Sequence, residues 1–220
     1  MHGLTHAAGQ PYALSRALNS WSKKFKAKSL SIAEHKFGTS SDLTINNFRL
    51  LRAVDVFALL EKLREEFEIF HLHARSFFWS PPSFVENFSD LAFIKSIGGK
   101  IVFNFRGTEA RIPTEFNRIN KYSYSDHDPL GTKEIYNDES IKKLIDNISK
   151  YADKILVPDE ELRHYVKDAS ILPRTTLSTS TINQPRNKNF LRILHAPSNS
   201  GVKGTDIILQ AVEDLKNEGF

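Results

Sequence analysis

The sequence contains no cysteine, which excludes disulfide bonds and thiolate metal sites. It has no apolar run approaching the ~20 residues that a membrane-spanning helix needs. The first ten residues lack the charged segment followed by an apolar stretch that marks a signal peptide. The Gly-rich fingerprints of the dinucleotide-binding and P-loop classes are also missing. These absences favour a cytoplasmic protein without disulfides, thiolate metal sites, a membrane-spanning helix or either Gly-rich fingerprint.

The composition is that of a folded globular protein, with 40% hydrophobic and 25% charged residues among 220. The formal net charge is +4 and the pI is near 9.2. We expect no nucleic-acid partner, because no basic stripe with interleaved aromatic residues is present. The mild positive excess suits an enzyme that handles phosphates, and it is compatible with peripheral association at the cytoplasmic face of an anionic membrane.

Segments with helical periodicity alternate with short apolar runs. Apolar residues recur at helical spacing after Pro11, Val56, Ile141 and Ile208, with Asp138 placed to cap the third helix. Runs typical of buried strands occupy residues 28–33, 68–74, 100–106, 153–157, 169–172 and 190–195. This alternation predicts an α/β fold, a Rossmann-like parallel sheet flanked by helices, with ligands beyond the carboxyl ends of the strands.

A change of composition divides the chain. Residues 175–189 are rich in Ser, Thr and Asn without apolar periodicity, which is typical of an interdomain linker. We therefore expect one domain over residues 1–174 and the first strand and helix of a second α/β domain over 190–220. Residues 120–137 are expected to form a long surface loop.

The most informative segment surrounds Lys203 and Gly204. A predicted strand ends, a polar loop follows, and this Lys-Gly pair opens a helix. Backbone N–H groups and the positive end of the helix dipole would face the loop, while the lysine supplies a point charge, so the segment suits an anion such as phosphate. The alternative is an ordinary strand-to-helix connection with an exposed lysine.

Residues 195–219, HAPSNSGVKGTDIILQAVEDLKNEG, resemble the opening of the second domain of GT-B glycosyltransferases of family four. The resemblance implies that Lys203 binds the diphosphate of a nucleotide-sugar donor and that Gly204 allows close approach of the backbone. Many members carry an arginine in the preceding loop, and this chain has none there.

Two upstream segments are similar to the same family. Gly9 and Gln10 stand in a loop before a helix, which implies a place near the donor phosphates or the acceptor. His71 and His73 resemble the family's His-x-His strand and share one face of that strand. For this pair a buried hydrogen-bonded role, a metal site and a role facing the cleft stay open. A metal site needs a third ligand that nothing in the sequence nominates, whereas the cleft role suits His73 and Arg75.

The next family-like strand ends in a charged segment containing Arg106, Thr108, Glu109 and Arg111. The resemblance implies that these residues hold the hydroxyls or phosphate of an acceptor. Aspartate is more usual at the position of Glu109. The alternative is a local surface pair of arginine and glutamate, which contributes little energy.

The resemblance implies retaining transfer of a sugar to a glycan, lipid-linked or small-molecule acceptor, with no metal or other cofactor. Only residues 1–4 precede the Gly9 loop, too few for an ordinary central strand, and the donor domain has one strand and one helix. We therefore expect part of a glycosyltransferase that is inactive as given. The alternative is a degenerate, non-catalytic module that binds a glycan or a protein.

Overall fold

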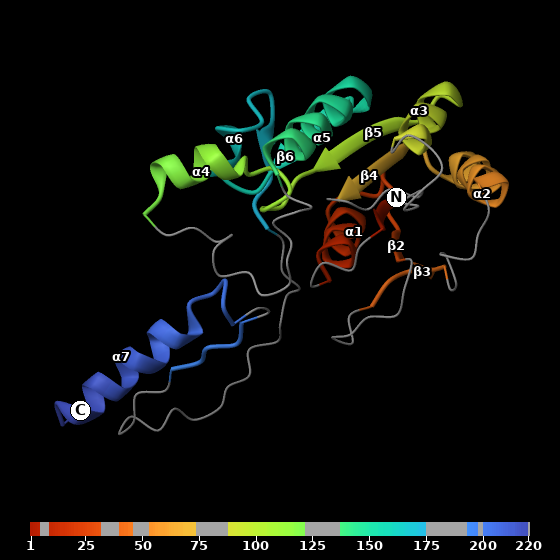
Figure 1. Cartoon of the computed structure of the whole chain (residues 1–220). Coiled ribbons are helices and arrows are strands. Elements are labelled where there is room, and N and C mark those ends of the chain that lie inside the picture. The colour runs from red at the N-terminus through yellow and green to blue at the C-terminus, as the bar shows by residue number, and fades with distance from the viewer. Residues whose placement is uncertain are drawn as a thin grey trace. The chain divides into compact units, whose positions relative to one another are not determined.

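The computed structural model describes residues 1–4, 9–31, 40–45, 53–73, 88–121, 137–174, 193–197 and 200–219 (Figure 1). The chain forms two compact units. Unit 1 comprises Met1–Arg111 with Ile141–Ser178, and unit 2 comprises Ile112–Ser140 with Thr179–Phe220. The predicted linker, Arg75 and most of the predicted loop over residues 120–137 lie outside the described residues. The predicted domain boundaries therefore stay a prediction.

Unit 1 is built on a seven-stranded, all-parallel sheet with the strand order β3-β2-β1-β4-β5-β6-β7. This architecture confirms the α/β, Rossmann-like fold class. The strands are β1 (His2–Leu4), β2 (Ser29–Ser31), β3 (Leu43–Thr44), β4 (Ile69–His73), β5 (Lys100–Asn104), β6 (Lys154–Val157) and β7 (Ser170–Ile171).

Helices cover both faces of this sheet. Right-handed crossovers place α1, which joins β1 to β2, on one face of the sheet. They place the helices that follow β3, β4 and β5 on the other face. Figure 1 shows α1 on the opposite side of the sheet from α3 and α5. The helices of this unit are α1 (Gln10–Trp21), α2 (Ala53–Glu66), α3 (Ser89–Ser96), α5 (Asp138–Tyr151, which begins in unit 2) and α6 (Glu160–Arg163).

The two faces of the sheet differ in chemistry because side chains alternate along each strand. One face carries the apolar core, where Phe70, Leu72, Ile101 and Phe103 are fully buried. The opposite face buries polar side chains in the central strands: His2, Ser29, Ser31, His71, His73 and Asn104. The centre of the sheet is therefore polar on one side, and that side holds the candidate site.

The first strand corrects an expectation from the sequence. Residues 1–4 were expected to be too few for a central strand, yet β1 pairs in parallel with both β2 and β4. Its flanking bonds run from His2 N to Lys28 O and from His71 N to Met1 O, both at 2.8 Å. Three residues therefore serve as the central strand because both neighbouring strands supply bonds.

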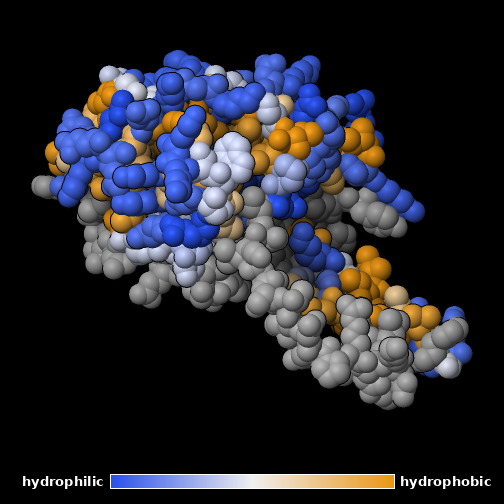
Figure 2. Space-filling view, turned by 180° about the vertical axis from the view of Figure 1, so that it is seen from behind, coloured by the Kyte–Doolittle hydropathy of each residue, from blue (hydrophilic) through white to orange (hydrophobic). Residues whose placement is uncertain are grey.

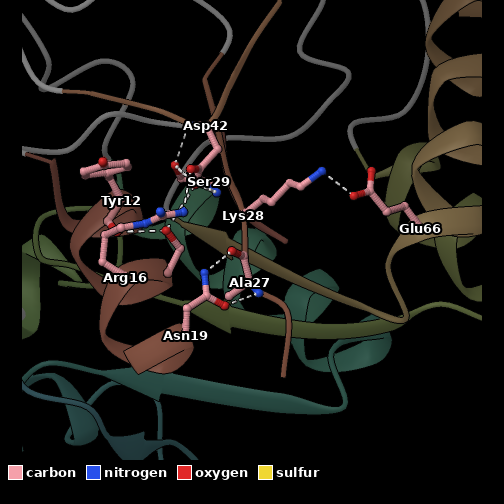
Figure 3. Close-up of polar contacts among 9 residues, drawn as sticks. Tyr12, Arg16, Asn19, Ala27, Lys28, Ser29, Asp42 and Glu66 are labelled. Carbon is pink, nitrogen blue, oxygen red and sulfur yellow. Dashed lines mark hydrogen bonds and ion pairs between the residues drawn. The ribbon is translucent and has the colours of Figure 1, made fainter. Parts of the chain in front are cut away.

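A hydrogen-bonded network ties α1 to β2 and the start of β3 (Figure 3). Asp42 accepts bonds from the Ser29 amide at 2.7 Å, the Ser29 hydroxyl at 2.9 Å and the Arg16 guanidinium at 2.6 Å. Asn19 exchanges two 2.8 Å bonds with the backbone of Ala27. Burial alone would raise the pKa of Asp42, but these bonds and the charge of Arg16 lower it overall. The network lies at the amino end of β2, away from the edge where ligands bind such sheets, and we assign it a structural role.

The helix ends follow local chemistry, with one correction. Pro11 lies in the first turn of α1, where its missing N–H costs no hydrogen bond. Asp138 was expected to cap α5, but Asn137 does so, because its side-chain oxygen accepts from Ser140 N at 2.8 Å. Asp138 instead accepts bonds from the amide and the hydroxyl of Thr114.

In unit 2 the described helices are α4 (Pro113–Ile119) and α7 (Thr205–Asn217). Gly219 follows α7 with φ 89°, which confirms its predicted place after the helix end. The strand expected over residues 190–195 is not present in the described residues 193–197, and residues 190–192 lie outside the description. Hydrophobic side chains are exposed here, including Leu194 at 91%, and Figure 2 shows hydrophobic surface around α7. None of the helices that the structure describes could cross a membrane.

Candidate functional site

The strand order places a topological switch point between β1 and β4. The chain proceeds from β1 outward to β2 and β3, and then returns to start β4 on the other side of β1. Ligands in open parallel sheets bind beyond the carboxyl ends of the strands at such a point. Gly9 follows β1, His73 ends β4 and Arg106 follows β5, so three of the predicted site segments come to this edge.

The amino-terminal end of α1 follows the first of these strands. Gly9 is buried and adopts φ 75°, a left-handed conformation that glycine takes without strain. Among the described residues no side chain caps this end, and the first turn carries no acidic residue. The partial positive charge of the helix end is therefore not offset by a local carboxylate, which favours an anion near Gly9 and Gln10.

Three histidines are brought together on the polar face of the sheet. His2 is the register partner of His71, and their Nδ1 atoms are 2.9 Å apart. The rings of His71 and His73 stack with centroids 4.6 Å apart. All three are buried, His73 with 1% of its surface exposed. His73 was expected to face the cleft; in the structure its ring is buried on the polar face of the sheet, stacked on the ring of His71.

Burial governs the protonation of these histidines. Desolvation lowers the pKa of His2 to about 2, with a further contribution from His71, and lowers that of His71 to about 4. The pKa of His73 is lowered well below its ordinary value, first by burial and then by the nearby charges of His71 and Arg106. All three imidazoles are therefore neutral near pH 7. Within the described part of the chain, His71 Nε2 and both ring nitrogens of His73 have no hydrogen-bond partner.

The loop after β5 is shaped by Glu109. Its carboxylate, 7% exposed, accepts bonds from the backbone N–H groups of Arg106 and Gly107. Burial lowers the pKa of the Arg106 guanidinium, while the Glu109 charge raises it and the Arg174 charge lowers it. Arg174 also donates to the Arg106 carbonyl at 2.9 Å. Glu109 therefore positions this loop through the backbone.

Arg111 makes a two-pronged ion pair. Its Nε and Nη2 atoms donate to the two carboxylate oxygens of Glu161, each at 2.6 Å. This pair joins residues 50 positions apart, so it is not the local arginine–glutamate pair that was the alternative. The Arg111–Glu161 pair fastens the loop after β5 to α6. Thr108, between Gly107 and Glu109 in this loop, is half-buried.

Lys203 and Gly204 belong to unit 2. Gly204 begins α7 with φ 64°, and Lys203 beside it is exposed. The preceding turn is closed by bonds from Gly204 N to Gly201 O at 3.1 Å and from Thr205 N to Ser200 O at 3.0 Å. Lys203 thus projects from a tight turn at a helix start, as the sequence predicted.

The sequence pattern missed His2, Asn104 and Arg174 as members of this region. Asn104 is the register partner of His73, and Arg174 follows β7. None of them belongs to a local pattern, because only the order of strands brings them near the predicted residues. A histidine in a short first strand that would lie beside a predicted His-x-His strand is the one signal that could have pointed to His2.

This edge of the sheet combines a helix start without a carboxylate, a cationic loop and neutral imidazoles. Such groups can bind an anionic or hydroxyl-rich ligand, or coordinate a metal ion. No protein-family model, curated protein or solved structure matches the chain.

Proposed function

We propose that the chain is part of a GT-B glycosyltransferase of family four. That enzyme transfers a sugar from a nucleotide diphosphate-sugar to a glycan, lipid-linked or small-molecule acceptor, with retention of configuration. The transfer step needs no metal, and the proposed location is the cytoplasm, including the cytoplasmic face of a membrane.

One observation carries the proposal. Three segments chosen for their family-like motifs, around Gly9, His73 and Arg106, lie at the carboxyl ends of β1, β4 and β5. These strands are neighbours in the sheet although their segments are far apart in the sequence. Their place at the edge where such sheets bind ligands supports the proposal.

The proposed roles follow from charge and exposure. Exposed Lys203 supplies a point charge to the donor diphosphate, and Gly204 lets the backbone come close. Gly9 and Gln10 add the positive end of α1. These groups favour transfer by stabilising the charge that develops on the departing diphosphate.

On the acceptor side we propose Arg106 and Thr108 as the groups that contact hydroxyls or phosphate, together with Arg75. His73 supports this edge from within the sheet. Glu109 and Arg111 become positioning residues, because their polar atoms already bond the loop backbone and Glu161.

A second candidate is a module that binds a glycan without transferring sugar. The engagement of Glu109 and Arg111 in contacts within the chain favours it, since fewer charged groups then remain for a substrate. The two candidates differ in whether a nucleotide diphosphate-sugar binds at all.

The test is amide NMR of the labelled chain during titration with a panel of nucleotide diphosphate-sugars and, separately, of oligosaccharides. The proposal predicts that one donor shifts the amides of Lys203, Gly204 and Gly9, and that Lys203→Ala removes the shifts at α7. Lys216→Ala is the matched control, because Lys216 is an exposed lysine in the last turn of α7, whereas Lys203 lies in the turn before the helix. Shifts with oligosaccharides and with no nucleotide would favour the binding module and contradict the transferase.

A further inference from the structure

The three histidines on the polar face of β1 and β4 have the composition of a metal site. His2, His71 and His73 each offer a ring nitrogen, and these three nitrogens lie within 4.8 Å of one another. The sequence offered no third ligand for His71 and His73, but the register of β1 against β4 supplies His2. The site does not depend on the proposed sugar transfer.

We propose that His2, His71 and His73 bind a divalent transition-metal ion of the zinc class. Three imidazoles are a ligand set that zinc uses, and nitrogen donors select zinc, cobalt and nickel over magnesium and calcium. Zinc–nitrogen bonds of 2.0–2.1 Å in tetrahedral geometry place ligand nitrogens about 3.4 Å apart. The ligand nitrogens, which lie within 4.8 Å of one another, must move closer together to hold the ion.

The unpartnered ring nitrogens support this assignment. A buried polar atom without a hydrogen bond is costly, and three such atoms belong to two adjacent histidines, His71 Nε2 and both nitrogens of His73. The strand geometry explains why they converge: His71 and His73 are two residues apart on one face of β4, and His2 is beside His71 on β1. A metal ion would satisfy one of these nitrogens on each residue.

Metal binding at this place would fasten the shortest central strand. β1 has only three residues, and its position depends on bonds to β2 and β4. A metal ion held by one ligand from β1 and two from β4 would join these strands directly. Because the unfolded chain does not preform the site, binding adds to folding stability.

The test uses the chain purified without a polyhistidine tag and dialysed against a chelator. Cobalt(II) is titrated first, because its visible absorption reports coordination number, and zinc(II) then displaces it. We expect one ion per chain, a spectrum of four- or five-coordinate cobalt, and a zinc-dependent rise in the urea midpoint. Failure of the folded wild-type chain to bind either ion would overturn the proposal.

Two single variants, His73→Gln and His2→Gln, test the ligands. Each should lower zinc affinity by more than roughly 100-fold, because even changes outside the ligand set cost 10–100-fold. His164→Gln is the control, since His164 is exposed and distant from the cluster in sequence, and it should bind as the wild type does. Unchanged binding in His73→Gln would show that His73 is not a ligand and would overturn the site.

Far-UV circular dichroism establishes that each variant is folded. If neither variant folds, X-ray absorption of the zinc-loaded wild type decides. Three imidazole ligands in its spectrum support the site, and fewer than three contradict it.

Discussion

His2 and His71 are 69 residues apart in the sequence, yet their Nδ1 atoms are 2.9 Å apart in the folded chain. Their closeness arises because they are register partners in β1 and β4. Together with His73 they place neutral imidazoles on the polar face of the sheet centre. This relationship has a consequence for stability as well as for ligand binding.

The metal-free chain should lose stability as the pH falls below the ordinary histidine pKa. Folded His71 has its pKa lowered to about 4, whereas in the unfolded chain it titrates near 6.5. Between these values the unfolded state binds more protons than the folded state, so the free energy of unfolding decreases as the pH decreases. The contribution of neutral His71 to stability is fully present only above about pH 6.5. Moving to about pH 5 should cost about 2 kcal/mol for this residue.

Urea unfolding of the chelator-treated protein across this pH range measures the effect. His71→Gln should flatten the slope, whereas His164→Gln should keep it. An unchanged slope in His71→Gln would mean that His71 is not buried in its neutral form.

Asp42→Ala should destabilise the fold by about 1–3 kcal/mol, because the buried Ser29 amide loses its acceptor. The change should also remove the coupling between Arg16 and the start of β3. Urea unfolding measures it, with Asp146→Ala at an exposed position of α5 as the control. Equal effects of the two changes would show that the network in Figure 3 does not stabilise the fold.

Glu109→Ala should destabilise by about 1–3 kcal/mol, because two backbone N–H groups at the turn after β5 lose their acceptor. Glu109→Gln should cost less, since its amide oxygen can still accept. The urea midpoints of both variants test this order, with Glu139→Ala as the exposed control. If Glu109→Gln and Glu109→Ala lower the free energy of unfolding equally, the negative charge of Glu109, and not its hydrogen-bond acceptor, stabilises the turn.

Arg111→Lys should change the free energy of unfolding by less than about 1 kcal/mol, because the ion pair with Glu161 is partly exposed. The lysine cannot reproduce the two-pronged geometry, so the small loss should be absent in a Glu161→Gln background. A double-mutant cycle by urea unfolding measures this coupling. A coupling well above 1 kcal/mol would show a larger structural role than its exposure indicates.

Periodicity predicted the larger elements well. The apolar stripe of Val56, Leu60 and Leu63 is buried on α2, and the apolar run that ends at His73 forms β4. Both could be predicted because the spacing of apolar residues within one such segment shows which face is buried. α3 and α4 were missed, since helices of 8 and 7 residues offer too few turns for a clear period.

The site was predicted only in part, for a physical reason. Glycine before a helix and charged residues after strands can be recognised locally, and Gly9 and Arg106 were found in this way. His2 and Arg174 become neighbours of the site through strand order and register, which depend on contacts across the whole sheet. The role of Glu109 in closing its own turn also depends on local geometry that the residue type does not reveal.

The central claim, that the chain binds the diphosphate of a nucleotide-sugar through Lys203, is tested most directly by calorimetry. We predict that, in a version of the protein that carries the whole donor domain, Lys203→Ala weakens binding of the nucleotide diphosphate-sugar by about 1.5–3 kcal/mol, the range for a hydrogen bond to a charged group. Binding of the corresponding nucleoside monophosphate should suffer less, and Lys216→Ala should change neither. Equal losses for both ligands in Lys203→Ala, or no binding of any nucleotide diphosphate-sugar by the version with the whole donor domain, would contradict the claim.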